Sequence, residues 1–561
     1  MVNRISNALT QLRRGRTPVS QLFDVAELGM TAARIGLQTG LAHELRAPAL
    51  GALLRQRLRG KLGLGSVYRV HAASRPETVA LVCSGRRITY RELDTRIDRL
   101  ATHLRHEQRL GRGSSAVLMM HNRAELVETQ AALARIGASV VSASWRSTPD
   151  ELEYLVSHSG ASTILVEAEL ADVVLAARPR LSRVGPGAII AVGGTRPELR
   201  SYDEIVERGP IDVVDADGED SAVVIYTSGT TGKPKGAVRR FASEQMLGFA
   251  QMVAELPLRT DDRHLAVCPL YHSTAFAFTS LTLVLGGTVV IEPKFDAERA
   301  LARIAEERIT TSAMVPTMLA RILALPAEVR RRYDTRSLRA VLSGGAPLSG
   351  ALARAFIEEH GHVLFNFYGA TETGINTLAT PDELVRSPGT IGHVVPGNEI
   401  RLLDDAGHEV PPGRTGELFV RNTMLVSYHR DDDATRASMR DGFFSVGDLA
   451  HVDANGLFHI DGRKRDMIIS GGVNVYPAEI EEVLHTHPAI AEVAVVGAPD
   501  ADLGERVRAC VVLRPSMELD VAEVTAFCRA RLSGPKIPRE WRVMDELPKN
   551  PTGKVLKREL R

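Results

Sequence analysis

The residues best suited to chemistry in this sequence form one loop that is rich in hydroxyl groups, glycine and lysine. The loop directly follows residues 222–226, an apolar run that is typical of a strand. Glycines let backbone N–H groups turn toward an anion, and hydroxyl and ammonium groups add further donors. The pattern predicts a phosphate-binding loop formed by Thr227, Ser228, Gly229, Thr230, Thr231, Gly232, Lys233 and Lys235.

This loop differs from the P-loop of kinases and GTPases. A P-loop has four residues between its first glycine and the Gly-Lys pair, and a Ser or Thr that binds magnesium follows the lysine. Here only two residues separate Gly229 from Gly232, and Pro234 follows Lys233. The spacing argues against a Walker-type NTPase or kinase, and it leaves a plain surface loop as the other interpretation.

A second segment, residues 368–373, combines three groups that a nucleotide site needs. Tyr368 supplies an aromatic ring that can stack on a base, Thr371 a hydroxyl that can reach a phosphate, and Glu372 a carboxylate that can bind Mg²⁺. Further segments with Gly, Asp, Arg or Lys in turn-like settings follow in the chain, at residues 343–347, 447–448, 462–466, 470–477 and 548–554.

Lysine is rare in this chain and concentrates in these segments. Of 69 basic residues, nine are lysine, so arginine is used almost everywhere that a cation is needed. A compact, rotatable ammonium is chemically distinct from a guanidinium, which makes each retained lysine informative. Six of the nine lie in or beside the segments named above: Lys233, Lys235, Lys464, Lys549, Lys554 and Lys557.

These segments, taken in order, resemble the signature motifs of the adenylate-forming superfamily, which includes acyl-CoA synthetases, peptide-synthetase adenylation domains and firefly-type luciferases. The resemblance covers about residues 70–561. It implies that ATP, Mg²⁺ and coenzyme A are bound. It also implies a fold of the α/β class, with a large N-terminal domain of layered β-sheets and helices and a small, mobile α+β C-terminal domain.

The resemblance also implies a role for single residues. Gly344, Gly345 and Ala346 would line the adenine and acyl pocket, and Tyr368 and Gly369 would contact adenine. Thr371 would contact the α-phosphate and Glu372 the Mg²⁺ ion. Asp448 would accept hydrogen bonds from the ribose hydroxyls, and Arg463 would bind ribose or phosphate. The residues expected to be catalytic are Lys554, Thr230, Glu372 and His272.

Two positions depart from the usual pattern of the superfamily. Arg465 stands at the expected hinge between the domains, where relatives often have Asp or Lys, and Val473 stands where they often have Glu. Gly471 and Gly472 belong to the loop that would approach coenzyme A. Because the adenylation step needs neither group, these departures bear on the transfer step. His272, which follows an aromatic residue, could equally be a packed core histidine.

Composition bounds the remaining possibilities. The 561 residues carry a formal net charge of +1, which argues against a nucleic-acid partner. Four scattered cysteines predict free thiols rather than disulfides or a zinc site. The sequence begins without the apolar core of a signal peptide and has no uncharged apolar stretch long enough to span a membrane, so we expect a cytoplasmic protein.

The chain is expected to contain three parts. Residues 1–65 form an Arg-rich, helix-like extension, residues 66–462 the adenylation domain, and residues 463–561 the C-terminal domain. The extension is expected to pack on the main body or at the subunit contact of a homodimer. The alternative is peripheral contact with the inner face of the cell membrane, because basic segments beside an amphipathic helix favour anionic lipid.

The sequence predicts an acid–thiol ligase. A medium- to long-chain fatty acid would react with ATP to give an acyl-adenylate, and the acyl group would pass to coenzyme A, with residues 273–287 as a candidate acyl tunnel. The alternatives are loading of a carrier protein, a ligase for an aromatic or amino acid, a luciferase-like oxygenase, and a non-catalytic acyl or nucleotide-binding protein. An intact set of Thr230, Glu372, Asp448 and Lys554 argues against the non-catalytic alternative.

Overall fold

The computed structural model describes residues 36, 38–40, 64–185, 187–212, 222–227, 235–240, 253–422, 432–471, 473–500, 502–549 and 554–561. By internal contacts the chain divides into two compact units. Unit 1 comprises residues 1–313 and 423–435, and unit 2 comprises residues 314–422 and 436–561. Each unit is described by itself. Among the described helices, none combines the length and the apolar composition that crossing a bilayer requires.

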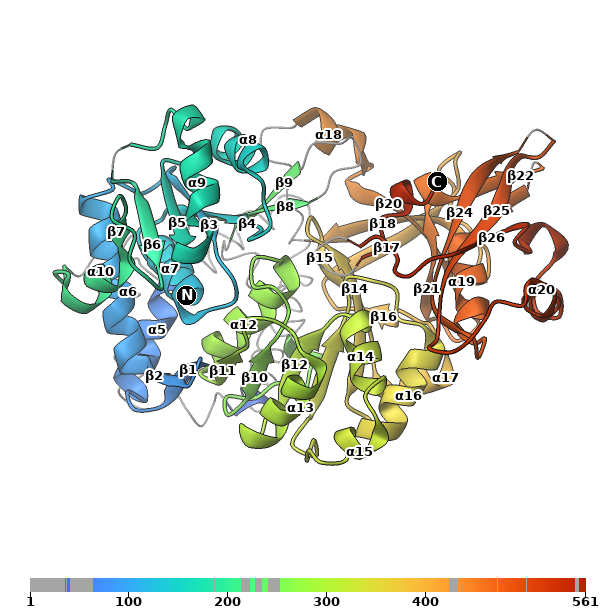
Figure 1. Cartoon of the computed structure of the whole chain (residues 1–561), viewed down its shortest axis with the longest axis horizontal. Coiled ribbons are helices and arrows are strands. Elements are labelled where there is room, and N and C mark those ends of the chain that lie inside the picture. The colour runs from blue at the N-terminus through green and yellow to red at the C-terminus, as the bar shows by residue number, and fades with distance from the viewer. Residues whose placement is uncertain are drawn as a thin grey trace, which may run out of the picture. The chain divides into compact units, whose positions relative to one another are not determined.

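Unit 1 contains a seven-stranded sheet between two layers of helices (Figure 1). Its strand order is β7-β6-β5-β3-β4-β8-β9, and only β9 is antiparallel to its neighbour. The strands are β3 (Ser115–Met119), β4 (Ser139–Ala143), β5 (Thr163–Glu167), β6 (Ile189–Val192), β7 (Arg200–Ser201), β8 (Ala222–Thr227) and β9 (Lys235–Arg240). The helices are α6 (Tyr90–His106), α7 (Ala124–Arg135), α8 (Pro149–Ser159), α9 (Ala171–Ala177) and α10 (Tyr202–Arg208).

A second group of strands in unit 1 follows the order β12-β10-β11-β1-β2 and is parallel except for β2. It consists of β1 (Val79–Cys83), β2 (Arg86–Thr89), β10 (Arg263–Ala266), β11 (Thr288–Ile291) and β12 (Thr311–Met314). Its helices are α5 (Leu64–Ser74), α12 (Ser273–Leu285) and α13 (Ala297–Glu306). The short helix α18 (Asp432–Ala437) lies at the boundary of the two units.

Local sequence explains where several helices begin. The Glu92 N–H donates to the Thr89 hydroxyl (3.2 Å) at the start of α6, as the spacing of the two residues predicts. Thr148 and Glu151 form a reciprocal capping box at α8, which ends at Gly160 in the left-handed region. The predicted apolar face of α6, which includes Leu93 and the following leucines, is fully buried.

Only a few residues of the N-terminal extension are described, and these contact the body of unit 1. The Gln38 side chain donates to the Leu256 carbonyl (2.8 Å), and the Thr260 N–H donates to the Thr39 carbonyl (2.8 Å). Thr39 is buried. These contacts agree with packing of this short piece on the main body, while the rest of the extension up to residue 63 lies outside the described residues.

Unit 2 begins with strands that end in the candidate site. Parallel β13 (Ala340–Ser343) and β14 (Leu364–Ala370) are followed by antiparallel β15 (Gly374–Ala379) and β16 (His393–Val394). The flanking helices are α14 (Pro316–Leu323), α15 (Ala327–Arg330), α16 (Gly350–His360) and α17 (Pro381–Arg386). An antiparallel sheet follows, with β17 (Asn398–Leu403), β18 (Gly416–Asn422), β19 (Met439–Arg440), β20 (Phe443–Val452) and β21 (Phe458–Arg463).

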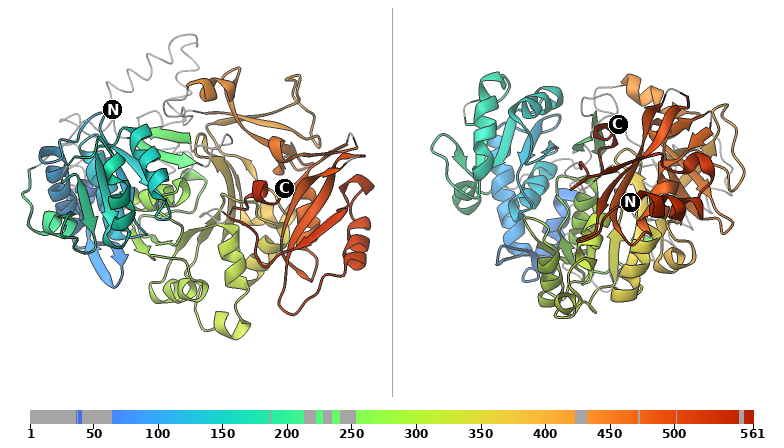
Figure 2. Two further views of the ribbon diagram at one scale, coloured as in Figure 1. Left: turned by 45° about the horizontal axis from the view of Figure 1, so that its top comes forward. Right: turned by 45° about the vertical axis from the view of Figure 1, so that its right-hand side comes forward.

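The C-terminal part of unit 2 is a small α+β module. Its sheet has the order β23-β22-β25-β24, with β26 beside β25. The module is the part of the ribbon coloured orange to red in Figure 2. The elements are β22 (Ile468–Ser470), β23 (Val473–Val475), α19 (Pro477–His485), β24 (Ile490–Asp500), β25 (Gly504–Leu513), α20 (Val521–Arg529) and β26 (Glu540–Val543). Helices α19 and α20 share one core cluster with β24 and β25, and the C-terminal residues pack against a second cluster that includes other residues of the same strands.

Burial along α20 follows the helical pattern of its apolar residues only in part, and the cysteines of the whole chain are free. Val524 and Cys528 are buried as the helical pattern of α20 predicts, but Val521 is 47% exposed. Val521 is the first residue of α20, directly after its cap Asp520. All four cysteines are buried free thiols, which confirms the prediction from their spacing.

Candidate active site

Three predicted nucleotide-site residues meet in unit 2. Asp448 on β20 faces Arg463 at the end of β21 across the antiparallel ladder, and their side chains form an ion pair (3.1 Å). The Tyr368 hydroxyl, from β14, donates to the other carboxylate oxygen of Asp448 (2.7 Å). Burial and the nearby Asp448 carboxylate raise the pKa of Tyr368 well above its usual value, so the phenol remains a donor.

Lys554 belongs to the same cluster. Its pKa is lowered to about 8, first because the ammonium is buried and then because Arg463 and Arg465 repel it, while Asp448 and Asp466 partly compensate. The fall from about 10.5 means that the site destabilises the ammonium, a cost that an anion bound beside it would offset. In this arrangement Lys554 could stabilise a negative charge that develops during a reaction. The Asp448 carboxylate beside it could accept hydrogen bonds from the hydroxyl groups of a sugar.

The turn between β14 and β15 carries Thr371 and Glu372, and amide side chains hold it in place. The Asn422 side chain donates to the Thr373 carbonyl (2.8 Å), and the Thr373 hydroxyl donates to Asn376 (2.7 Å). The side-chain oxygen of Asn398, on β17, accepts hydrogen bonds from the side chains of both Asn376 and Asn422. We did not predict this asparagine network, because its members stand alone on three different strands and form no sequence motif.

Glu372 fits a metal-binding role. It is buried (6% exposed), yet its carboxylate forms no hydrogen bond or ion pair with any described residue. A carboxylate that bonds to no neighbouring residue is available to a cation. No cluster of three or more His, Cys, Asp or Glu occurs in the described part of the chain. Glu372 would therefore hold Mg²⁺ together with phosphate oxygens and water, the environment that this ion prefers.

Glycines allow close approach at two motif positions. A Cβ on Gly344 would lie 2.5 Å from the ring of Phe367, and a Cβ on Gly369 would lie 1.9 Å from the Gly374 carbonyl oxygen. Gly345 has a φ of +77°, in the left-handed region. Both close contacts involve strand β14, so these glycines let the 343–347 turn and the Glu372 turn pack tightly against it.

We expect Gly369→Ala to destabilise unit 2 by about 3 kcal/mol, because backbone must move to admit the methyl group. Gly456→Ala is the matched control, since Gly456 has a positive φ of +79° but open space around its Cβ position, and it should cost about 1 kcal/mol. Thermal unfolding of the two variants measures the difference. Equal shifts in midpoint would show that the close contact with Gly374 is unimportant.

His272 lies in unit 1 at the residue before helix α12. Burial lowers its pKa to about 4, so the imidazole is neutral at physiological pH. Its Nε2 atom is buried and has no hydrogen-bond partner among the described residues. The ring packs beside that of Tyr271 (centroids 4.2 Å apart). An unpaired ring nitrogen of this kind is available to a ligand, which a fully satisfied core histidine would not offer.

Part of the predicted site lies outside the described residues. This holds for Ser228, Gly229, Thr230, Thr231, Gly232 and Lys233 of the phosphate loop, and for Gly472. The described strands β8 and β9 that flank the loop are paired in register, with Thr227 opposite Lys235. Ala346 follows Gly345 in the turn after β13.

The expected hinge and transfer loop lie in unit 2. Arg465 belongs to a short 3₁₀ turn, Lys464–Asp466, and its carbonyl accepts a hydrogen bond from the Arg561 side chain (2.9 Å). Lys464 pairs with Asp405 (2.8 Å). Gly471 follows β22, and its N–H donates to the Leu503 carbonyl (2.8 Å).

Comparisons with known proteins identify the family of this chain. The family model described as AMP-binding enzyme matches residues 68–428, and the model of the AMP-binding enzyme C-terminal domain matches residues 479–554. A feruloyl-CoA synthase from Amycolatopsis is 35% identical, covering 89% of this chain and 98% of the relative. The long-chain-fatty-acid–CoA ligase FadD13 of Mycobacterium tuberculosis is 30% identical, covering 89% and 98%.

A solved structure is similar over the same length. The crystal structure of the anthranilate CoA ligase AuaEII in complex with anthranoyl-AMP has a TM-score of 0.81 and 27% identity, covering 89% of this chain and 97% of that one. These matches confirm the resemblance drawn from the motifs and the expected α/β fold. The chain therefore belongs to the AMP-binding, adenylate-forming enzymes, as an acid–CoA ligase that uses ATP, Mg²⁺ and coenzyme A.

Proposed function

We propose that this enzyme activates an aryl-bearing carboxylic acid with an oxygen substituent on its ring and transfers the acyl group to coenzyme A. The observation that carries the ligase chemistry is the cluster of Lys554, Arg463 and Tyr368 around Asp448. Similarity to a feruloyl-CoA synthase at 35% identity supports the aryl class. The fatty acid that the sequence predicts is the second candidate, supported by 30% identity to FadD13.

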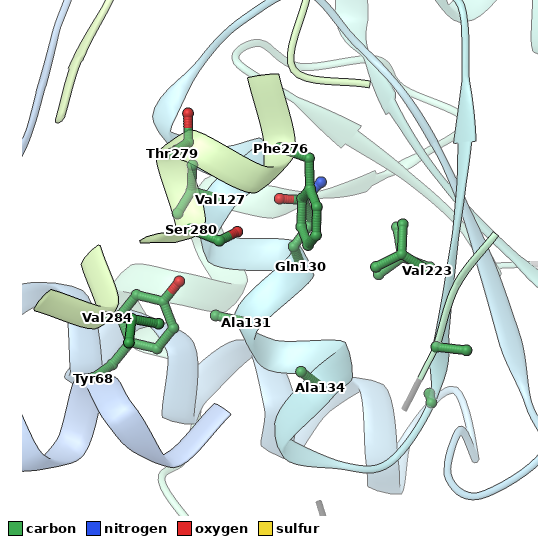
Figure 3. Close-up of a pocket in the computed structure, with 13 residues that line it drawn as sticks. Tyr68, Val127, Gln130, Ala131, Ala134, Val223, Phe276, Thr279, Ser280 and Val284 are labelled. Carbon is green, nitrogen blue, oxygen red and sulfur yellow. The ribbon is translucent and has the colours of Figure 1, made fainter. Parts of the chain in front are cut away.

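A pocket in unit 1 supports the choice of an aryl acid (Figure 3). It lies between α5, α7, α12 and strands β4 and β8, and one of its walls is formed by α12. Phe276, Ser280 and Val284 repeat every four residues along that wall, in line with His272. From Phe276 to Val284 the helix rises about 12 Å. The cavity volume is about 30 Å³, so the side chains that line the pocket must move apart to admit an aryl ring. The lining residues are Tyr68, Val127, Gln130, Ala131, Ala134, Ala138, Val140, Ala222, Val223, Phe276, Thr279, Ser280 and Val284.

Two polar atoms in this pocket lack partners. The Nε2 atom of Gln130 and the hydroxyl of Thr279 are buried and form no hydrogen bond with a described residue. Leaving a buried donor unpaired costs about 1–3 kcal/mol. A ring hydroxyl or methoxy oxygen could accept from Gln130, whereas a plain alkyl chain could not. These atoms support an oxygenated aryl acid over a saturated fatty acid.

In the proposed first step, a carboxylate oxygen of the acid attacks the α-phosphorus of ATP, and pyrophosphate leaves. Positioning and charge neutralisation matter most for such an in-line displacement, and no protein nucleophile is needed. Asp448 holds the ribose hydroxyls, Arg463 and Tyr368 fix the Asp448 carboxylate, and protonated Lys554 stabilises the negative charge at the α-phosphate. Mg²⁺ on Glu372 would supply neutralisation of phosphate charge.

In the proposed second step, the coenzyme A thiolate attacks the acyl carbonyl carbon, and AMP leaves with the pair of electrons of the acyl–phosphate bond. The thioester is the product. Lys554 acts in the first step only, so a change at Lys554 should spare the second when acyl-adenylate is supplied.

The test is an acid panel. Pure enzyme with ATP and Mg²⁺ is given ferulate, cinnamate, indoleacetate, octanoate and palmitate, with and without coenzyme A, and AMP and acyl-CoA are measured by mass spectrometry. The proposal predicts the highest kcat/KM with ferulate-like acids and acyl-CoA only when coenzyme A is present. A preference for octanoate or palmitate would establish the fatty-acid candidate, and acyl-AMP without acyl-CoA would indicate a carrier-protein acceptor.

We expect Gln130→Met to lower kcat/KM for ferulate about tenfold while leaving that for cinnamate within about twofold, because only ferulate can bond to the amide. Gln108→Met is the matched control, since Gln108 lies away from this pocket and bonds the Gly187 carbonyl. An equal loss of kcat/KM with both acids would show that Gln130 shapes the pocket but forms no hydrogen bond with the ring substituent.

A further inference from the structure

Helix α19 of the C-terminal module carries two consecutive glutamates that make very different contacts. Glu482 reaches outside the module and accepts a hydrogen bond from the N–H of Gly350 (2.9 Å), the first residue of helix α16. A carboxylate at the amino end of a helix is favoured by the helix dipole. A Cβ on Gly350 would lie 2.4 Å from the Cβ of Pro388 and 3.2 Å from Glu482 Oε1, so the glycine leaves the space that Glu482 occupies.

The neighbouring Glu481 turns toward the C-terminal segment. Its Oε1 atom pairs with the ammonium of Lys557 (2.7 Å) and accepts from the N–H of Val495 on β24 (2.7 Å). The Glu481 side chain is 15% exposed and that of Lys557 21%, so this ion pair is partly shielded from water. Lys557 stands three residues after Lys554, which ties α19 to the segment that bears the proposed catalytic lysine.

The other side of that segment is anchored within the module as well. Lys549 pairs with Glu492 (2.6 Å) and forms a backbone bridge with Val555, and the Leu560 side chain is fully buried against β24 and β25. The residues on both sides of Lys554 are thus fixed to the module. The position of Lys554 relative to Asp448 is therefore set by how the module rests on the rest of unit 2.

Helix α19 also contacts β21, the strand that ends in Arg463 and pairs with the Asp448 strand (Figure 1). We propose that Glu482 is a positioning residue for adenylation: by seating α19 on the amino end of α16, it holds Lys554 in the cluster around Asp448. The inference rests on the proposed function, because it assigns Glu482 to the step in which Lys554 acts. Glu482 touches no substrate and works through Lys554.

The electrostatics of Lys554 supply a signature for this role. The charged groups that face it are Arg463, Arg465, Asp448 and Asp466, and burial together with the arginines lowers its pKa to about 8. We call the contact of α19 with the amino end of α16 the seating of the module. Because seating buries Lys554 beside two arginines, it lowers the affinity of Lys554 for a proton. Conversely, deprotonation of Lys554 favours seating, because a neutral amine is buried at less cost. A variant that seats poorly should therefore show a raised apparent pKa together with a reduced rate.

The experiment compares Glu482→Ala and Glu482→Gln with the wild type in the full-length enzyme. Adenylation is measured by ATP–pyrophosphate exchange across pH 6–10, and thioester formation is measured separately from supplied acyl-adenylate and coenzyme A. We expect Glu482→Ala to lower the exchange rate on the low-pH plateau about tenfold. The pH at which the exchange rate falls to half should rise from about 8 by about one unit, because a tenfold change in the seating equilibrium corresponds to a one-unit change in the apparent pKa. Glu482→Gln should lie between, because its amide oxygen still accepts from Gly350.

Glu523→Ala is the matched control, a carboxylate on helix α20 of the same module that is 62% exposed. It should leave the exchange plateau, the pH limb and the thioester rate at wild-type values. A further readout is acetylation of Lys554 by an amine-reactive reagent, followed by mass spectrometry. Lys554 should react faster in Glu482→Ala than in the wild type, while Lys536 should react equally in both.

Each outcome decides the proposal. Wild-type exchange with an unmoved pH limb in Glu482→Ala would overturn it, and so would equal loss in both half-reactions, which indicates a general structural role. The proposed function is tested apart from this by Lys554→Ala. If that variant loses exchange while Glu482→Ala does not, only the positioning role fails. If Lys554→Ala keeps the full exchange rate, the catalytic role proposed for Lys554 is wrong, and the positioning role of Glu482, which depends on it, is wrong as well.

Discussion

Replacing Lys554 with alanine should lower the rate of adenylation about a thousandfold, the order expected when one fixed donor to a developing anion is removed. The reason is local: the ammonium lies in the cluster with Asp448 and Arg463, and its burial makes its charge effective. ATP–pyrophosphate exchange measures this step alone. Thioester formation from supplied acyl-adenylate should remain within about threefold of wild type, because the role that we propose for Lys554 is confined to the first step.

The lowered pKa of Lys554 gives a second test with a defined sign. The protonated amine is the active form, so kcat/KM for ATP, which reports the free enzyme, should fall as pH rises through about 8. Lys554→Arg keeps a charge that does not titrate in this range, so its lower rate should show no fall until well above pH 9. A limb that stays near pH 8 in Lys554→Arg would assign the titration to another group.

Replacing Glu372 with glutamine should lower adenylation about a hundredfold and raise the Mg²⁺ concentration needed for half-maximal rate at least about tenfold. Glu372 is the buried carboxylate of the β14–β15 turn and forms no hydrogen bond or ion pair with a described residue. The amide keeps the shape of the side chain but removes the charge that would hold the ion. Titration of exchange activity with Mg²⁺ measures both effects.

The same variant separates metal binding from folding. Because Glu372 bonds to no described residue and glutamine keeps the shape of its side chain, Glu372→Gln should leave the thermal midpoint of the ligand-free protein unchanged. Glu399→Gln is the control, since Glu399 is an exposed carboxylate on β17 that pairs with Arg421. It should alter neither activity nor the Mg²⁺ requirement. A lowered midpoint in Glu372→Gln with an unchanged Mg²⁺ requirement would show that Glu372 supports the turn instead.

Much of the local structure followed from the sequence because the signals act over a few residues. The spacing of Thr89 and Glu92 marks the start of α6, and the apolar run at residues 222–226 forms most of β8. The sequence also singled out Tyr368 and Asp448, whose order in the chain is shared with the superfamily. Their direct hydrogen bond depends on strand pairing, which connects residues 80 positions apart.

The acid was harder to predict than the chemistry. Motifs report on the nucleotide, whose structure is the same for every member of the superfamily, so they carried no information on the acyl group. The segment 273–287 was compatible with a tunnel wall and with a core helix: Phe276, Phe278 and Leu281 are all buried, and Phe276 and Ser280 also line a pocket. Gln130 reached this pocket from α7, far away in the sequence.

The sequence by itself determined the family, named candidate nucleotide-binding residues and marked the start of several helices, because each of these depends on neighbouring residues or on a motif. Only the tertiary structure decided which groups lack partners and which elements meet. The unpaired amide nitrogen of Gln130 and the contact of Glu482 with the end of α16 depend on which distant residues surround each side chain. Such properties arise from packing between distant segments, and no local pattern encodes them.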